Sequence, residues 1–184
     1  MKLSLDTRDL SEVRTDALIV GRHSDEAKLT PAFRAVDEKL GGLLSKVLAA
    51  EKFEGKPGQV SHVHTDGRLR AARVLVAGLG PRKGSAADAV RSAASAAARR
   101  ARDLGARSAA AYLAADGLSA RARAQATVEG AQLGRIVSTD SEAPQPFRGP
   151  RHLRLFQIAV ANRRQKAPDN LFIDRDPSLC RDVR

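Results

Sequence analysis

Residues 73–91 read Arg-Val-Leu-Val-Ala-Gly-Leu-Gly-Pro-Arg-Lys-Gly-Ser-Ala-Ala-Asp-Ala-Val-Arg, an apolar run followed by a Gly- and Pro-containing turn and an Ala-rich stretch. An unbroken apolar run of this length is typical of a strand buried on both faces. Ser85 is placed to cap the helix that follows, with Asp88 three residues later in the favourable first turn. That helix is expected to run from Ala86 to about Leu104 and to stop at Gly105.

The alternation of strand and helix continues on both sides of this stretch. Strands are expected at residues 16–21, 59–64, 73–79 and 108–113. A helix is expected from Pro31 to Leu48, with Thr30 as N-cap and with Gly41-Gly42 interrupting it where another element comes close. A further helix is expected from Ser119 to Leu133, closed by Gly134. This order predicts an α/β fold with a central, largely parallel sheet.

The character of the chain changes after Gly134. Residues 138–147 have the Ser, Asp and Pro content of a loop, and residues 153–160 alternate only partly and could form a strand. The remainder is polar and aperiodic. We therefore expect one folded domain over residues 1–134 and a divergent or disordered tail over residues 135–184.

The charge of the chain is strongly positive. Its 184 residues include 32 Lys and Arg against 21 Asp and Glu, for a net charge of +11. Such a surplus suggests a nucleic-acid partner, but the basic residues are scattered and aromatic residues, on which single strands stack, are only 3%. Ala, Arg and Gly are also the residues of GC-rich codons, which explains a basic chain without any partner. Nucleic-acid binding is therefore an alternative and not the leading interpretation.

Membrane insertion and disulfide bonding are not expected. The longest apolar runs, such as residues 74–79, are far shorter than the roughly 20 residues that cross a bilayer. The first residues lack the apolar core of a secretory signal. Cys180 is the only cysteine, which excludes an internal disulfide and suits a reducing compartment. We expect a cytoplasmic protein with no membrane partner.

Five segments occur together in the order and at the gaps of a known family. They are Gly41-Gly-Leu-Leu44, Phe53-Glu-Gly-Lys-Pro-Gly-Gln59, Arg73-Val-Leu-Val-Ala-Gly-Leu-Gly80, the helix with Ala89-Val-Arg91 and Ala97-Ala-Arg-Arg-Ala101, and Val128-Glu-Gly-Ala-Gln-Leu-Gly134. Together they resemble the N-terminal domain of the leucyl (cytosol) aminopeptidases, over residues 1–134. The resemblance implies a three-layer α/β/α domain with a macro-domain-like sheet that is mixed and mostly parallel.

The resemblance also implies where the chemistry of such a protein would lie. Family members release N-terminal amino acids through two divalent metals, Zn or Mn, held by Lys, Asp and Glu in a larger C-terminal domain. None of those motifs occurs in this sequence, so no catalytic residue, metal ligand or cofactor is expected in this chain, and the chain alone is expected to be inactive. The implied partners are other subunits or the catalytic domain. DNA is a further implied partner, because some bacterial members of the family bind it.

The tail departs from the family pattern. Family members continue after the last shared segment with a Tyr-x-Phe-Asp-x-Tyr kind of sequence, whereas this chain has Arg135-Ile-Val-Ser-Thr-Asp-Ser141. Codons for Ile136–Ser141, read two bases later, can give Arg-Phe-Asp-Arg-Phe. A frameshift at about residue 136 is therefore one hypothesis and a divergent in-frame tail is the other, and the sequence of the gene distinguishes them.

One turn is a candidate anion site. It runs Gly78-Leu-Gly-Pro-Arg-Lys-Gly84 between a strand and a helix, where backbone amides and a helix N-terminus could hold a phosphate. The site residues would be Gly78, Gly80, Arg82, Lys83 and Gly84. The turn matches neither the Walker pattern nor the full dinucleotide fingerprint, and a macro-like fold is the only hint of an ADP-ribose pocket. The favoured alternative is a glycine turn that lets the strand pack on the next helix.

A second candidate is a pair of histidines. His62 and His64 lie two residues apart on a predicted strand and so share one face, as two ligands of a zinc ion would. No Cys or third His stands nearby in the sequence to complete a site, and zinc needs three or four protein ligands. We therefore favour two solvent-facing histidines without a metal.

Overall fold

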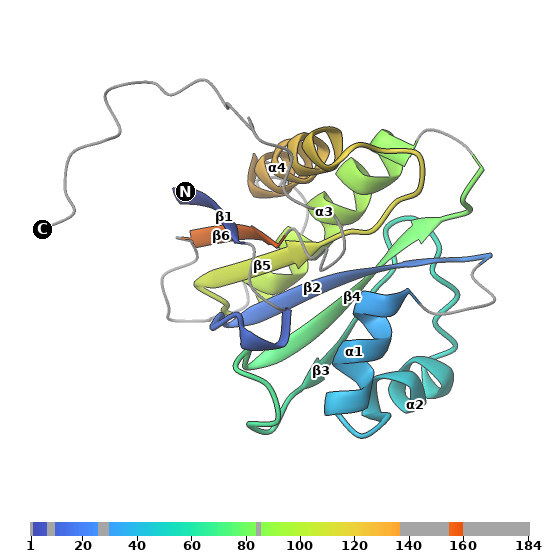
Figure 1. Cartoon of the computed structure of the whole chain (residues 1–184), viewed down its shortest axis with the longest axis vertical. Coiled ribbons are helices and arrows are strands. Elements are labelled where there is room, and N and C mark those ends of the chain that lie inside the picture. Colours follow the sequence, from blue (N-terminus) through green and yellow to red (C-terminus); the bar gives the residue numbers. More distant parts are fainter. Residues whose placement is uncertain (1, 7–9, 26–29, 84–85, 137–154, 160–184) are drawn as a thin grey trace, which may run out of the picture.

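A single mixed sheet organises the protein. The computed structural model describes residues 2–6, 10–25, 30–83, 86–136 and 155–159 (Figure 1). The strands are β1 (Lys2–Asp6), β2 (Ala17–His23), β3 (Val60–His64), β4 (Arg73–Gly80), β5 (Ser108–Tyr112) and β6 (Leu155–Ala159), in the spatial order β1-β6-β5-β2-β4-β3. Every neighbouring pair is parallel except β3 with β4, which is antiparallel. The strands expected at β2, β3, β4 and β5 are confirmed.

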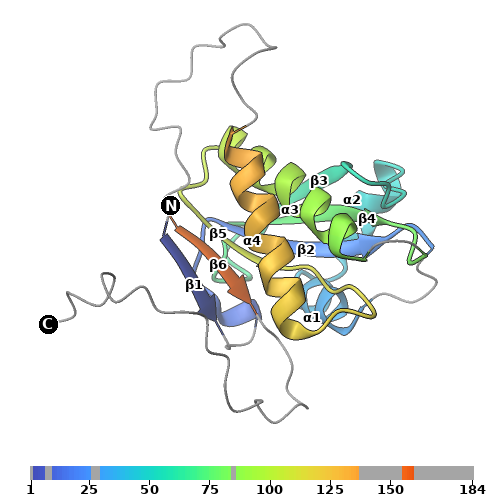
Figure 2. The same ribbon diagram turned by 90° about the horizontal axis from the view of Figure 1, so that it is seen from above.

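Helices cover both faces of the sheet, which confirms the three-layer α/β/α arrangement (Figures 1 and 2). The helices are α1 (Pro31–Lys39), α2 (Leu43–Ala50), α3 (Ala86–Asp103) and α4 (Ala120–Ile136), with a short 3-10 helix at Leu10–Glu12. Because strand residues alternate between faces, Ile19 and Leu75 pack toward α3 and α4, while Leu18 and Val74 pack toward α1 and α2.

The predicted helix from Pro31 to Leu48 is two helices, so that prediction was wrong. Gly41 and Gly42 have φ of +67° and +75°, and this left-handed conformation ends α1 and begins α2. A Cβ at Gly42 would meet nothing within 4 Å, so the conformation and not the approach of another element requires glycine there. Thr30 caps α1 as expected, because its hydroxyl accepts a 3.2 Å bond from the Phe33 N–H.

The second helix prediction was wrong at its end, for a different reason. Gly134 does not close α4, which continues to Ile136. A Cβ at Gly130 would lie 2.8 Å from the Arg91 Cα, and one at Gly134 would lie 3.1 Å from the Ser95 Cα, both on α3. These two glycines therefore let the backbones of α3 and α4 come into contact.

The C-terminal end of α3 is formed as the sequence predicts. Gly105 has a φ of +75°, and its N–H donates to the Arg102 carbonyl at 2.8 Å. The Ala106 N–H donates to the Ala101 carbonyl at 2.9 Å, which completes a Schellman motif. Ser85, the expected N-cap of the same helix, lies outside the described residues.

The strand that could form within residues 153–160 is present as β6. It lies between β1 and β5 and is parallel to both, pairing Leu5 with Ile158 on one side and Ala111 with Ile158 on the other (Figure 2). Residues 137–154 and 160–184 lie outside the described part of the chain. The division at residue 134 and the frameshift remain predictions.

Candidate functional site

The parallel strands give the sheet two chemically different edges. β2, β4 and β5 all direct their carboxyl ends to one edge and their amino ends to the opposite edge. Ligands of open α/β sheets bind outside the carboxyl ends. The turn after β4, which carries the predicted anion site, lies at this carboxyl edge. A cavity at the amino edge, which the sequence did not predict, is the second candidate.

The two glycines of the predicted anion site that the structure describes, Gly78 and Gly80, lie at the end of β4 and are explained by close packing. A Cβ at Gly78 would lie 2.7 Å from the Gly55 carbonyl carbon and nearer still to the Lys56 carbonyl oxygen. Gly80 has a φ of +72°, and a Cβ there would lie 2.8 Å from the Pro57 Cγ. These glycines therefore make room for the turn at residues 55–58. The sequence-based expectation that they make room for the following helix was wrong for Gly78 and Gly80.

Arg82 is already paired with carboxylates of the protein. Its backbone N–H lies 3.1 Å from both carboxylate oxygens of Asp25, which follows β2. Its guanidinium pairs with Asp116, which follows β5. Beside it lies a cavity of about 270 Å³ that Lys83 also lines. Gly84 lies outside the described residues, and anion binding at this turn stays a prediction.

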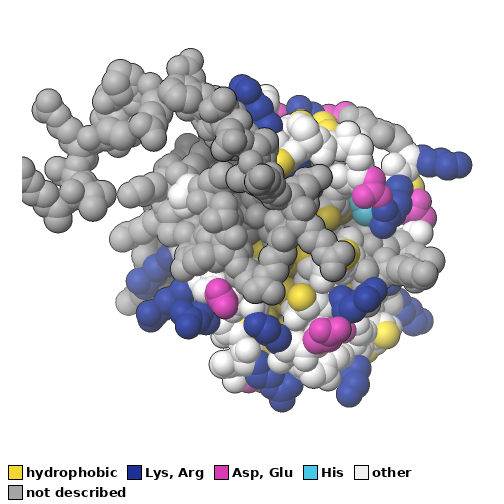
Figure 3. Space-filling model, in the orientation of Figure 1, with side chains coloured by type: hydrophobic (Ala, Val, Ile, Leu, Met, Phe, Trp, Pro, Cys, Tyr) yellow, Lys and Arg dark blue, Asp and Glu magenta, His cyan; other side chains and the backbone are white. Residues whose placement is uncertain are grey.

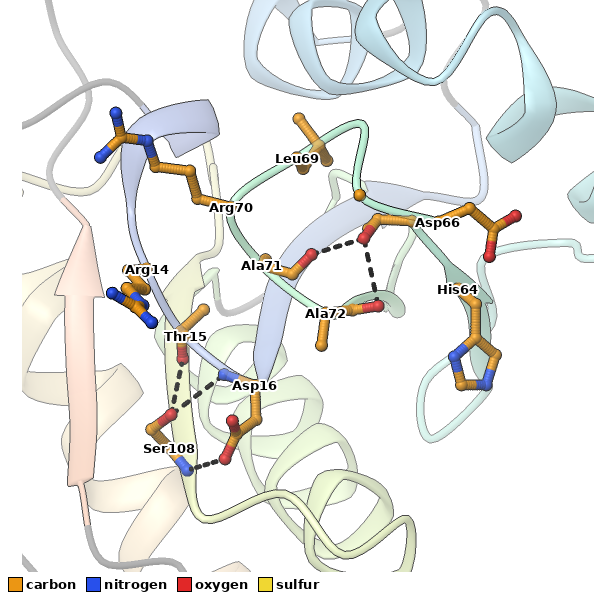
Figure 4. Close-up of a pocket in the computed structure, with 12 residues that line it drawn as sticks. Arg14, Thr15, Asp16, His64, Asp66, Leu69, Arg70, Ala71, Ala72 and Ser108 are labelled. Atoms are coloured by element: carbon orange, nitrogen blue, oxygen red, sulfur yellow. Dashed lines mark hydrogen bonds between the residues drawn. The ribbon is translucent and has the colours of Figure 1, made fainter.

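A larger cavity, of about 650 Å³, lies at the amino edge (Figure 4). One wall comes from residues 14–16 before β2 and from Ser108 at the start of β5, and the other comes from the β3–β4 connection at residues 64–72. Figure 4 shows that Arg14 and Arg70 come from these two different segments and extend toward the same side. The sheet order, which the sequence does not reveal, is what brings them together.

The walls of this cavity are held by internal hydrogen bonds. The Asp16 carboxylate accepts from the backbone N–H groups of Arg107 at 2.7 Å and Ser108 at 3.0 Å. The Ser108 hydroxyl accepts in turn from the Asp16 N–H at 3.0 Å. On the opposite wall, the Thr65 hydroxyl donates to the Ala71 carbonyl at 2.6 Å. These bonds fix the position of both walls.

Arginines at the amino edge differ in what they contact. Arg68 donates to the Leu40 carbonyl at 2.8 Å, at the end of α1, and Arg73 donates to the Leu104 carbonyl at 2.5 Å, just after α3. Both cations complement the negative end of a helix dipole. Arg14 and Arg70 are exposed and have no hydrogen bond or ion pair to any described residue.

The two predicted histidines lie on one face of β3, as expected. Their ring centroids are 6.0 Å apart in an edge-on arrangement, with His62 half-buried and His64 exposed. Burial, together with the positive charge of Arg100 and the proximity of His64, lowers the pKa of His62. Among the described residues there is no group of three or more His, Cys, Asp or Glu side chains placed to hold a metal ion. Nor does any helix in the described ranges combine the length and apolarity that crossing a bilayer requires.

Comparison of the sequence with known families gives a match over most of the folded part of the chain. Residues 19–139 match the N-terminal domain of the cytosol aminopeptidase family. A probable cytosol aminopeptidase of Parasynechococcus marenigrum is 35% identical over 163 residues, covering 86% of this chain and 31% of the relative. That of Alkaliphilus metalliredigens is 34% identical over 80 residues, covering 44% of this chain and 16% of the relative. The chain thus spans less than a third of the length of these relatives.

Solved structures show the same similarity. A mutant of tomato leucine aminopeptidase superposes with a TM-score of 0.67 at 24% identity, covering 88% of this chain and 32% of that one. The bottromycin maturation enzyme BotP in complex with Mn has a TM-score of 0.52 at 30% identity, covering 79% and 27%. A macrodomain of Oceanobacillus iheyensis has a TM-score of 0.64 at 12% identity, covering 88% and 85%. The macro-like fold expected from the sequence is confirmed.

Proposed function

The chain belongs to the cytosol aminopeptidase family, as its N-terminal domain, and on that basis we propose that it acts as a non-catalytic domain beside a metallopeptidase domain. The match of residues 19–139 to this one domain is the observation that carries the proposal. The share of the curated relatives that the chain spans, 16% and 31% in two of them, supports it, because most of each relative lies outside the region of similarity.

The reaction belongs to the domain that this chain does not match. In the proposed whole protein, two divalent metals, Zn or Mn, activate water for the release of N-terminal amino acids with Leu-like side chains. The Mn complex of BotP, which is 30% identical to this chain, supports a metal-dependent reaction. The proposed location is the cytoplasm, in keeping with the family, and the proposed partners are the catalytic domain and other subunits.

Hydrolysis of leucine p-nitroanilide tests the catalytic part of the proposal. The purified chain with added Mn²⁺ should show no turnover above buffer, while the complete Parasynechococcus marenigrum relative serves as the positive control. Turnover that scales with the concentration of the chain and disappears with EDTA would contradict a non-catalytic role.

A chimera tests the accessory part. The chain should replace the corresponding N-terminal region of the same relative, to which it is 35% identical, and the chimera should assemble and hydrolyse the substrate. The relative with that region deleted is the control and should lose assembly, activity or both. A deletion variant as active and as well assembled as the complete relative would show that the domain has no such role.

DNA binding is a second candidate function, supported by the net charge of +11 and by exposed arginines such as Arg14, Arg70 and Arg107 at the amino edge. Figure 3 shows Lys and Arg side chains spread over the visible face, with Asp and Glu between them. DNA affinity measured at two salt concentrations tests this candidate, because binding through phosphates weakens steeply with salt. Negligible binding at both concentrations would remove it.

A further inference from the structure

We propose that the cavity at the amino edge binds a small molecule with two or more negative charges, through Arg14 and Arg70. The inference does not depend on the proposed function, because it rests on the contacts of the cavity residues alone. The cavity of about 650 Å³ is within the size range of ligand pockets. All of the residues that line it belong to the described part of the chain.

The first reason is that the guanidinium groups of these two arginines have no hydrogen-bond or ion-pair partner among the described residues. Arg68 and Arg73, at the same edge, each donate to a carbonyl at or beyond the end of a helix, so the fold itself accounts for them. Arg14 and Arg70 make no hydrogen bond or ion pair with a carboxylate or carbonyl among the described residues. Two guanidinium groups from separate segments that extend to the same side of a cavity form a positively charged rim (Figure 4).

The second reason is that the polar groups of the walls are already satisfied. The negative charge of Asp16 is stabilised by two backbone N–H groups, and the hydroxyls of Ser108 and Thr65 have their own partners. None of these groups needs a ligand to complete its hydrogen bonds, but the Asp16 carboxylate keeps its negative charge and would repel an anion placed directly beside it. The guanidinium groups are therefore the strongest hydrogen-bond donors that remain for an incoming molecule.

Asp66 limits where an anion can bind. This exposed carboxylate also lines the cavity, but Figure 4 shows it on the far side of the β3–β4 connection from Arg14 and Arg70, next to His64. An anion would be repelled by Asp66 and attracted by the arginines. The proposed site is therefore the side of the cavity that faces residues 14 and 70.

Guanidinium chemistry defines the class of ligand. Each guanidinium presents a planar fork that binds a carboxylate or a phosphate through two parallel hydrogen bonds. Two forks from different segments suit two anionic groups joined in one small molecule. A phosphate compound and a polycarboxylate share this chemistry, so pyrophosphate and citrate are the probes that separate them.

Isothermal titration of the full chain with pyrophosphate and with citrate tests the proposal. We expect saturable binding of at least one probe at one site, and a loss of about tenfold or more in affinity in the double variant Arg14→Gln/Arg70→Gln, since each charge-assisted bond contributes 1.5 kcal/mol or more, roughly tenfold. The variant Arg14→Lys/Arg70→Lys keeps the charge but loses the forks, and should bind with intermediate affinity.

The matched control is Arg34→Gln/Arg121→Gln, which removes the same charge from two exposed arginines outside the cavity. Its affinity should stay within about twofold of the parent chain, because screening weakens distant charges at about 0.15 M salt. Chemical shift changes on binding should centre on residues 14–16 and 65–72. Absence of saturable binding by the parent, or an equal loss in the control, would overturn the proposal.

Discussion

The two edges of the sheet carry the same residue type in opposite situations. At the carboxyl edge, Arg82 contacts Asp25 through its backbone and Asp116 through its side chain. At the amino edge, Arg14 and Arg70 line a cavity without a carboxylate partner among the described residues. The edge at which α/β folds usually bind ligands is thus the one whose arginine is neutralised internally. A basic side chain near a glycine turn therefore does not by itself indicate an anion-binding site, because carboxylates of the protein can already neutralise it.

Helix direction explains part of this difference. α3 follows β4 and returns toward the amino edge, so its C-terminal end, with its partial negative charge, lies there. Arg68 and Arg73 complement the ends of α1 and α3. Basic residues therefore gather at this edge for structural reasons, and the arginines that exceed this need are the ones available for a ligand.

The largest expected effect is on stability, and it differs between a glycine at the carboxyl edge and one at the amino edge. Gly78→Ala at the carboxyl edge should lower the free energy of unfolding by about 3 kcal/mol, because its Cβ would overlap the backbone at Gly55 and Lys56. Gly67→Ala at the amino edge should cost only about 1 kcal/mol, because its φ of +77° is strained for alanine but nothing lies within 4 Å of the added Cβ. Urea denaturation measures both, and equal losses would show that the close packing at Gly78 can relax.

The next effect concerns the wall of the amino-edge cavity. Asp16→Ala should cost about 1–2 kcal/mol, because the N–H groups of Arg107 and Ser108 lose their acceptor. Asp66→Asn is the control, since this exposed carboxylate is bonded to no described residue and asparagine tolerates the φ of +48° at this position, and it should change stability by less than about 0.5 kcal/mol. If urea denaturation gave the two variants the same stability, the Asp16 bridge between β2 and β5 would contribute nothing.

A smaller effect is expected for the exposed carboxylate at the carboxyl edge. Asp25→Ala should cost less than about 1 kcal/mol, because the freed Arg82 N–H can bond to water. The same variant tests the predicted anion site, because removing a competing carboxylate should strengthen phosphate binding at the turn, measured by titration. Arg82→Gln combined with Asp25→Ala is the control and should lower that affinity again. Unchanged phosphate binding in Asp25→Ala would argue against an anion site there.

The smallest effect is a dependence of stability on pH through His62. Its pKa in the folded protein lies below the ordinary value of 6.5, owing to burial, Arg100 and His64, so the unfolded chain binds more protons in that range. The free energy of unfolding should therefore fall as the pH decreases from above 6.5 through the folded pKa, and His62→Gln should lack this contribution. Urea denaturation between pH 8 and pH 5 compares the two proteins. A wild-type loss no larger than that of the variant would contradict the prediction.

The salt dependence of the His62 pKa separates the effect of nearby charges from the effect of burial. High salt screens the charge of Arg100 but leaves the effect of burial, so the His62 pKa, followed by NMR, should move part of the way toward its ordinary value. A pKa that does not respond to salt would contradict a net lowering by the nearby charges, in which Arg100 and His64 outweigh the opposing Glu51.

Most of the fold could be predicted from local patterns. The apolar run of β4 and the capped start of α1 each depend on a few consecutive residues, and both are as expected. The errors lie at glycines: Gly41 and Gly42 end a helix through positive φ, whereas Gly134 lies within one because α3 is close. Sequence position alone does not distinguish these reasons.

The candidate sites were less predictable. The turn after β4 was recognisable from its glycines and basic residues, but its pairing with Asp25 and Asp116 joins loops that follow different strands. The Asp66-Gly67 dipeptide between two strands is a recognisable hairpin signal. That this connection places Arg70 on the same side of the cavity as Arg14 depends on the order of strands in the sheet, which no local sequence pattern contains.

The position of β6 has a consequence for how the chain folds during synthesis. β1, made first, pairs in the described sheet only with β6, which is made about 150 residues later. Until β6 has been synthesised, β1 has no strand to pair with, and the edge of β5 that β6 will cover is exposed. A transcript or polypeptide interrupted near residue 136 would leave both edges permanently open to chaperones or to other strands.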